Sequence, residues 1–231
     1  MRIAVNQIST FHWTFEEDLR HYREAGLTAL GVWRKKLDDC GTERGLDLLH
    51  ESGLRVSSLS WAGGFTGSDG RSHRESIEDG LDAIRAAAGM KAGCLILYTG
   101  GRGGHTHSHA QRLVRVALQE LVDAAAACDV CLALEPMHHD LATEWTFLTS
   151  LGATVDFLDV LREEGLDDQP APIGLVVDAY HVLPEVAWSG IRAEWIPRVA
   201  LIQIGDRRLP PGVDSDRVPL GTGSLPLADF V

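Results

Sequence analysis

The sequence has few cysteines, few aromatic residues and no long apolar run. Only 4 of its 231 residues are cysteine, and 6% are aromatic. Three of the cysteines lie in apolar or helical stretches, where a reduced, buried thiol is the usual interpretation. No stretch approaches the roughly 18 apolar residues of a membrane span, and the first residues lack the apolar region of a secretory signal. We therefore expect a cytoplasmic protein.

Positive charge is also scarce. The chain has 21 Lys and Arg residues against 33 Asp and Glu, a formal net charge of −12. Such a charge argues against nucleic acid or an anionic membrane surface as the main partner. Hydrophobic residues make up 45% and charged residues 23%, an ordinary globular profile. The length predicts one large domain over residues 1–231.

Short apolar runs recur along the chain, each bounded by Gly, Pro or polar residues, as is typical of strands buried on both faces. There are seven of them: Ile3–Val5, Ala29–Trp33, Val56–Leu59, Cys94–Tyr98, Val130–Glu135, Ile173–Asp178 and Val199–Ile204. Helical patterns lie between them. Strands that alternate with helices predict βα units and a parallel sheet.

Helix boundaries can be read at several positions. Thr14 with Glu17, and Ser72 with Glu75, have the spacing of capping boxes. Three glycines stand where helices should end: Gly26, Gly53 and Gly165. The longest helix is expected to bury one apolar face: Leu113, Ala117, Leu121, Ala124, Ala125 and Cys128. We interpret Cys128 and Cys131 as core residues, because a redox pair would not run from a helix end into a strand.

Either an open doubly wound sheet or a closed barrel fits this alternation. The segment after the first strand, VNQISTFHW, lacks the GxGxxG of a dinucleotide-binding sheet. An α/β fold of the (β/α)8 TIM-barrel class is therefore favoured. Residues 225–231 resemble the beginning of the seventh helix, so the last βα unit is missing from this sequence. We expect that it was lost or left out, because an open barrel would expose two strand edges.

Oxygen-bearing side chains stand at the ends of three neighbouring strands. Glu135 ends the fifth strand, Asp178 ends the sixth, and Gln203 lies near the end of the seventh. Active sites of parallel barrels form at these ends, so the three side chains should converge. Two adjacent carboxylates repel each other unless a cation lies between them, and a divalent ion such as Mg²⁺, Mn²⁺, Co²⁺ or Zn²⁺ suits such ligands. The alternative is that the carboxylates pair with arginines or cap helices.

The segments LALEPMHH, LVVDAYH and LIQIGDRR, followed by RVPLGTGSLPL, resemble the xylose-isomerase-like TIM-barrel superfamily of sugar phosphate isomerases and epimerases. The resemblance implies one divalent metal held by Glu135, Asp178 and Gln203, with Gln203 similar to the third ligand of hydroxypyruvate isomerases. It implies that Glu135 is catalytic and transfers a proton. A fourth ligand, a glutamate of the eighth strand, has no counterpart here.

The same resemblance implies a substrate-binding role for His181, three residues after Asp178, and for Arg208. The alternatives are a structural histidine, and an arginine that pairs with Asp206. His138 is a further candidate for substrate binding. Other strand-end residues are equally consistent with lining a sugar-sized cavity or packing under a loop: His12, Trp13, Trp33 and Trp61.

The segment after the fourth strand carries two weaker signals. His105, His107 and His109 alternate in a pattern that can bind metal, but a solvated loop or helix start is favoured. The glycines of Gly100–Gly104 suggest phosphate binding through backbone amides, yet the GK[ST] of a P-loop is absent.

We expect an isomerase or epimerase that acts on a sugar or keto-sugar by proton transfer beside a carbonyl, through an enediolate. A lyase or dehydratase would use the same metal site. A non-catalytic sugar-binding barrel subunit is a third alternative, kept open by the absent eighth strand. A phosphodiesterase similar to endonuclease IV is disfavoured by the sparse ligand set and the negative charge. A homo-oligomer is expected because it is common among the proteins that this chain resembles.

Overall fold

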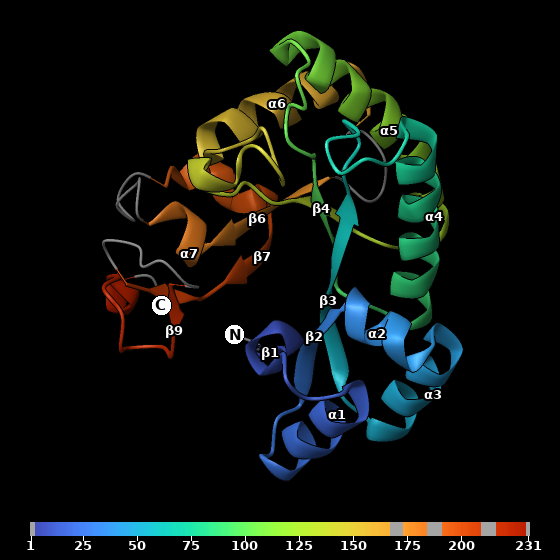
Figure 1. The fold of residues 1–231 in the computed structure, drawn as a ribbon, viewed down its shortest axis with the longest axis vertical. Helices are drawn as coiled ribbons and strands as arrows, with labels where there is room; N and C mark the ends of the chain where they lie inside the picture. The colour runs from blue at the N-terminus through green and yellow to red at the C-terminus, as the bar shows by residue number, and fades with distance from the viewer. Residues whose placement is uncertain (1–2, 167–172, 184–190, 209–215, 230–231) are drawn as a thin grey trace.

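In the computed structural model, a parallel seven-stranded sheet curls into an arc with helices on its outer side (Figure 1). The structure describes residues 3–166, 173–183, 191–208 and 216–229. The strands are paired in chain order: β1 (Val5–Asn6), β2 (Ala29–Trp33), β3 (Arg55–Gly63), β4 (Leu95–Tyr98), β5 (Leu132–Leu134), β6 (Gly174–Asp178) and β7 (Val199–Gln203). Every pair of neighbours in this sheet is parallel, as the alternation predicted. β1 and β7 form the two edges of the described sheet.

The helices follow the strands in the order expected of βα units. They are α1 (Phe15–Glu24), α2 (Arg34–Cys40), α3 (Thr42–Ser52), α4 (His73–Gly89), α5 (His107–Ala127), α6 (Leu151–Glu163) and the short α7 (Ala179–Val182). Both predicted capping boxes are present, at the starts of α1 and α4. The three predicted stop glycines all have positive φ, which favours glycine over residues with a Cβ.

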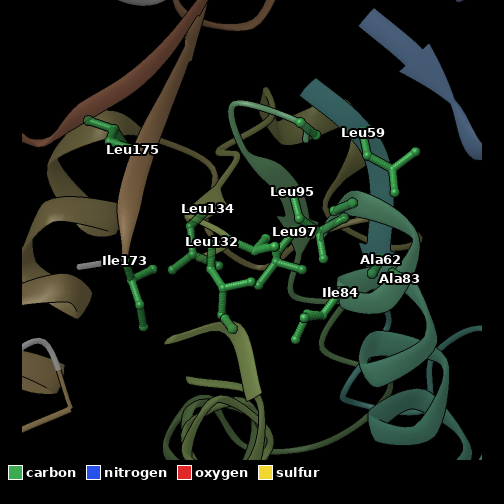
Figure 2. Packing of buried hydrophobic residues seen from close by; sticks show 14 of the residues in the cluster. Leu59, Ala62, Ala83, Ile84, Leu95, Leu97, Leu132, Leu134, Ile173 and Leu175 are labelled. Atoms are coloured by element: carbon green, nitrogen blue, oxygen red, sulfur yellow. The ribbon is translucent and has the colours of Figure 1, made fainter. Parts of the chain in front are cut away.

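The large hydrophobic core lies between the sheet and the helices. Figure 2 shows leucines of β3, β4 and β5 together with Ala83 and Ile84 of α4 among the residues of this core. On the opposite face of the sheet, a small second cluster comprises Cys94, Ile96, Ala133 and Val176. Side chains alternate between the two faces of a strand, so residues two positions along from this second cluster also point into the barrel interior.

Three details differ from the sequence-based expectations. The buried face of α5 is rotated, because its fully buried members include Val114 and Leu118. Cys128 caps the end of this helix and is exposed, so its interpretation as a core residue is wrong. After β7 the chain forms an antiparallel hairpin of β8 (Asp206–Arg207) and β9 (Arg217–Val218), which the pattern of apolar runs did not predict.

The end of the described chain contains a short 3-10 helix, Leu227–Asp229. No helix in the described ranges combines the length and the apolar character needed to cross a membrane.

Candidate metal centre

Glu135 comes directly after β5, two positions beyond the interior-facing Ala133. Its side chain is therefore directed into the barrel, where the residue is only 2% exposed. The indole Nε1 of Trp61 donates a hydrogen bond of 2.7 Å to Oε2 of Glu135. Burial, and then the nearby Asp178, raise the pKa of Glu135 to about 8, although Trp61 and Arg217 act in the opposite direction.

Asp178 is the last residue of β6, two positions beyond the interior-facing Val176. It is 2% exposed, and its two oxygens have different surroundings. Oδ1 accepts the backbone N–H of Tyr180 at 2.9 Å and so caps α7. Oδ2 lies 3.8 Å from Nε2 of His181 and 3.7 Å from Nη2 of Arg217. The helix cap and the arginine contact considered for this carboxylate are thus both present, and Oδ2 also lies beside the imidazole of His181.

His181 is carried toward Asp178 by the turn of α7. It is 6% exposed, and its Nδ1 has no hydrogen-bond partner. Burial, followed by the charge of Arg217, lowers the pKa of His181 to about 2. The imidazole is therefore neutral at any physiological pH and has a lone pair available for a ligand.

Glu135, Asp178 and His181 together form a group with the composition of a metal site. One ligand atom from each lies within 4.8 Å of the other two, and all three residues are buried. Among the described ranges, this is the one group of three or more His, Cys, Asp and Glu residues that is so arranged. Two buried carboxylates with raised pKa values and a neutral imidazole with an unpartnered nitrogen fit a divalent cation, which would compensate the charge repulsion.

Gln203 lies beside this group. It is the register partner of Asp178 across β6 and β7, so the two side chains project from the same face of the sheet. Gln203 is half-buried. Its role as a ligand stays a prediction.

His138 extends the group on one side. It is buried, and its ring centroid is 5.3 Å from that of His181 and 5.7 Å from that of Tyr180. Neither ring nitrogen has a hydrogen-bond partner, although Nδ1 is 3.4 Å from Oδ2 of Asp140. Burial lowers the pKa of His138, followed by the charge of Arg207. A buried imidazole whose ring nitrogens make no hydrogen bond is consistent with the predicted substrate contact.

The β8–β9 hairpin brings two arginines to the ring of Tyr180. The guanidinium of Arg217 is 3.6 Å from the ring centroid, and that of Arg207 is 4.8 Å from it. Asp216 holds this arrangement together, since it accepts a hydrogen bond from the Tyr180 hydroxyl and forms an ion pair with Arg207. Arg208, the arginine singled out from the sequence, is exposed.

Asp206 does not pair with either neighbouring arginine in the described structure. Its carboxylate instead accepts four backbone N–H groups, those of Arg207, Gly221, Gly223 and Leu225, and so closes the loop after β9. The arginine pairing considered for Asp206 is therefore wrong, because its acceptor capacity is used by the backbone.

A row of three aromatic residues, Trp61, Trp145 and Tyr98, begins at Glu135, where Trp61 makes its hydrogen bond. The ring of Trp61 is 5.5 Å from that of Trp145, which in turn is 5.3 Å from that of Tyr98. All three residues are partly exposed. The sequence had suggested Trp61 as a cavity-lining residue, whereas Trp145 and Tyr98 were not singled out.

The histidines and glycines after β4 have structural roles in the described chain. His105 contacts the carbonyl of Thr66 at 3.2 Å, and His107 begins α5. A Cβ at Gly101 would lie 2.1 Å from the carbonyl oxygen of Thr143, and one at Gly100 would lie 2.3 Å from Oγ1 of Thr66. These glycines therefore allow neighbouring loops to pack closely, which accounts for them without a bound phosphate.

The fold and the converging strand ends place the chain in a known family. Residues 19–231 match the model of the xylose isomerase-like TIM barrel, and the chain belongs to this family. A comparison with curated proteins gave no match.

Solved structures show the same fold. The crystal structure of protein SMc04130 from Sinorhizobium meliloti 1021 is 25% identical, with a TM-score of 0.84 and coverage of 99% of this chain and 82% of that chain. The IolI protein with a bound zinc atom is 19% identical, with a TM-score of 0.78 over 100% of this chain and 83% of that one. The 3-keto-D-glucoside 4-epimerase YcjR from E. coli is 16% identical, with a TM-score of 0.74 and coverage of 100% of this chain and 85% of that chain. The last two likenesses concern the fold alone.

Proposed function

We propose that the protein is a divalent-metal-dependent isomerase or epimerase that acts on a sugar or a sugar-like hydroxy-carbonyl compound. The observation that carries this proposal is the grouping of Glu135, Asp178 and His181, whose ligand atoms lie within 4.8 Å of one another at the interior ends of β5 and β6. The zinc atom bound in IolI and the epimerase activity named for YcjR support the same chemistry on this fold.

Glu135, Asp178 and His181 are the residues proposed to hold the metal, with Gln203 adjacent to them. A bound divalent ion would act as a Lewis acid that stabilises the negative charge of an enediolate. Glu135 is proposed to remove the proton from the carbon beside the substrate carbonyl and, in an isomerisation, to return it to the neighbouring carbon on the same face. An epimerisation would need a second proton donor on the opposite face of the enediolate.

Other residues are proposed to bind the substrate. His138 places its imidazole 5.3 Å from that of His181, where a substrate hydroxyl can donate to or accept from a ring nitrogen. The partly exposed rings of Trp61, Trp145 and Tyr98 offer an apolar wall of the kind on which the C–H face of a sugar packs. Arg208 stays a predicted contact for substrate oxygens.

The experiment that tests this proposal is hydrogen exchange at carbon. A panel of ketoses, aldoses and keto-sugars is incubated with the protein and Mn²⁺ in D₂O, and deuterium in each compound is followed by NMR. We expect deuterium beside the carbonyl of at least one compound, at a rate reduced by about 10²–10⁴ in Glu135→Gln, the range for loss of a general base. The exposed Glu78 provides a matched control, since Glu78→Gln should retain the wild-type rate. Absence of exchange across the panel would contradict the proposed reaction.

A further inference from the structure

Trp61 is connected to Glu135 by a hydrogen bond and to the rest of the fold by independent contacts. Its indole N–H donates to Oε2 of Glu135 at 2.7 Å. At the other end of the residue, the backbone carbonyl of Trp61 accepts a hydrogen bond of 3.1 Å from Nη1 of Arg34. The residue is thus held from both its side chain and its backbone, and β3 carries it to the interior face of the sheet.

Arg34 is itself fixed in a defined orientation. Its guanidinium forms two hydrogen bonds with the carboxylate of Asp79 on α4, at 2.7 and 3.1 Å. Asp79 also pairs with Arg71 at 3.0 Å. A bidentate arginine–carboxylate pair restricts the guanidinium plane, so the contact from Arg34 to Trp61 has little freedom. The backbone at Trp61 is therefore held by α4 as well as by its own strand.

The ring of Trp61 is supported on its other side. Trp145 lies against it at 5.5 Å, and Tyr98 lies 5.3 Å beyond Trp145. The hydroxyl of Tyr98 accepts a hydrogen bond of 3.1 Å from Arg71, the arginine that also pairs with Asp79. Polar and aromatic contacts therefore converge on Trp61 from Arg34 of α2, which α4 holds in place, and from the loop that carries Trp145.

We propose that Trp61 is a positioning residue for Glu135: its indole N–H holds Oε2 and so presents Oε1 to the metal and the substrate. This inference rests on the proposed function, because it assigns Glu135 a role as a ligand. A carboxylate turns freely about its last bond unless one oxygen is held, and partners of this kind typically contribute 10- to 100-fold to metal affinity. Trp61 has no ligand atom of its own for the metal, so it acts through Glu135.

The alternative is that Trp61 contributes only ring area, as packing or as a wall for a sugar. Two replacements separate these roles. Trp61→Phe removes the N–H and part of the ring, whereas 3-benzothienylalanine incorporated at position 61 keeps the ring shape and replaces only the N–H. Trp145→Phe is the matched control, since it reduces the same aromatic row without removing the donor to Glu135.

Mn²⁺ affinity of each protein is measured by isothermal titration, after urea denaturation has shown that each is folded. We expect about 10-fold weaker binding for both replacements at position 61, and less than about 2-fold for Trp145→Phe. Wild-type affinity in the benzothienylalanine protein would overturn the proposal, because the ring alone would then suffice. The same holds if Trp145→Phe weakens binding as much as Trp61→Phe.

A second readout needs no metal. The indole ¹H–¹⁵N resonance of Trp61 is identified by its absence in Trp61→Phe and is followed in metal-free protein. We expect it to move upfield in Glu135→Ala, because the indole N–H then loses its acceptor. An unmoved resonance would overturn the positioning role. If the resonance moves in the variant but the wild-type protein binds no Mn²⁺, the hydrogen bond is intact and the proposed function has failed.

Discussion

The guanidinium of Arg217 lies 3.7 Å from Oδ2 of Asp178 while it rests on the ring of Tyr180 at 3.6 Å. Its side chain is 45% exposed, whereas that of Asp178 is 2% exposed. A cation from the β8–β9 hairpin thus faces the carboxylate at which a divalent ion is proposed to bind. Arg217 compensates part of the charge of Asp178 in the metal-free protein and would compete with the proposed metal for the same oxygen.

Replacement of Arg217 should therefore strengthen metal binding. We expect Arg217→Gln to bind Mn²⁺ up to about fivefold more tightly than wild type, which corresponds to the 0–1 kcal/mol typical of an exposed charge. The difference should shrink at 0.5 M salt, because screening weakens the repulsion. Isothermal titration at two salt concentrations measures it. Arg192→Gln, at an exposed arginine that pairs with Glu194, is the control. Weaker binding in Arg217→Gln would contradict the expected competition.

The pKa of Glu135 predicts how stability depends on pH in the metal-free protein. The folded state keeps the Glu135 proton up to about pH 8, whereas the unfolded chain releases it near pH 4.5. The unfolded state then binds fewer protons over this window, so the free energy of unfolding falls as pH rises from 4.5 to 8. The slope from this one group is on the order of 1 kcal/mol per pH unit.

Urea denaturation in EDTA at pH 5 to 8 measures this slope. Glu135→Gln should have a flatter profile than wild type and should be the more stable of the two at pH 8. For Glu78→Gln, at an exposed glutamate, the free energy of unfolding should depend on pH as it does in wild type. Parallel profiles for wild type and Glu135→Gln would mean that Glu135 titrates as it does in the unfolded chain.

The buried ion pair of Lys36 and Asp18 lies in the first part of the chain, and we expect it to contribute to the stability of the fold and not to metal binding. Nζ of Lys36 lies 2.7 Å from Oδ2 of Asp18, with both side chains buried, and it also donates to the carbonyl of Thr10. Asp18→Asn leaves the buried ammonium uncompensated, so we expect a loss of about 3–5 kcal/mol in the free energy of unfolding.

The matched control is the exposed pair of Asp82 and Arg85, whose side chains are 65% and 66% exposed. Asp82→Asn should cost less than about 1 kcal/mol, as is usual for exposed pairs. Urea denaturation compares the two variants at pH 7. A cost below 1 kcal/mol for Asp18→Asn would show that Lys36 finds water or another partner when Asp18 is replaced.

Much of the fold could be predicted from the sequence because local signals and periodicity determine it. The apolar runs correspond to the seven strands, and Thr14 and Ser72 begin helices as predicted. The positions of Glu135 and Asp178 were also predictable, since a residue at the end of a parallel barrel strand has its place set by the strand. The side of α5 that is buried was not, because alanine fits either face of a helix and does not define the stripe.

Other parts of the site depend on contacts that sequence spacing does not reveal. Asp216 and Arg217 reach Tyr180 and Asp178 through a hairpin with very short strands, which leaves no periodic pattern. The bond from Trp61 to Glu135 joins residues 74 positions apart and depends on the rotamer of an indole ring. His181 was assigned to the substrate, and only the direction of its side chain after the turn of α7 places it among the candidate metal ligands.

The central claim is that Glu135, Asp178 and His181 form a divalent-metal site. It is tested most directly by isothermal titration of metal-free protein with Mn²⁺ and Zn²⁺, for wild type, Asp178→Asn, His181→Ala and the exposed-site control Asp82→Asn. The account predicts one ion per wild-type and Asp82→Asn chain, and binding at least about 100-fold weaker in Asp178→Asn and His181→Ala. Wild-type protein that binds neither ion, or variants that bind as tightly as wild type, would contradict it.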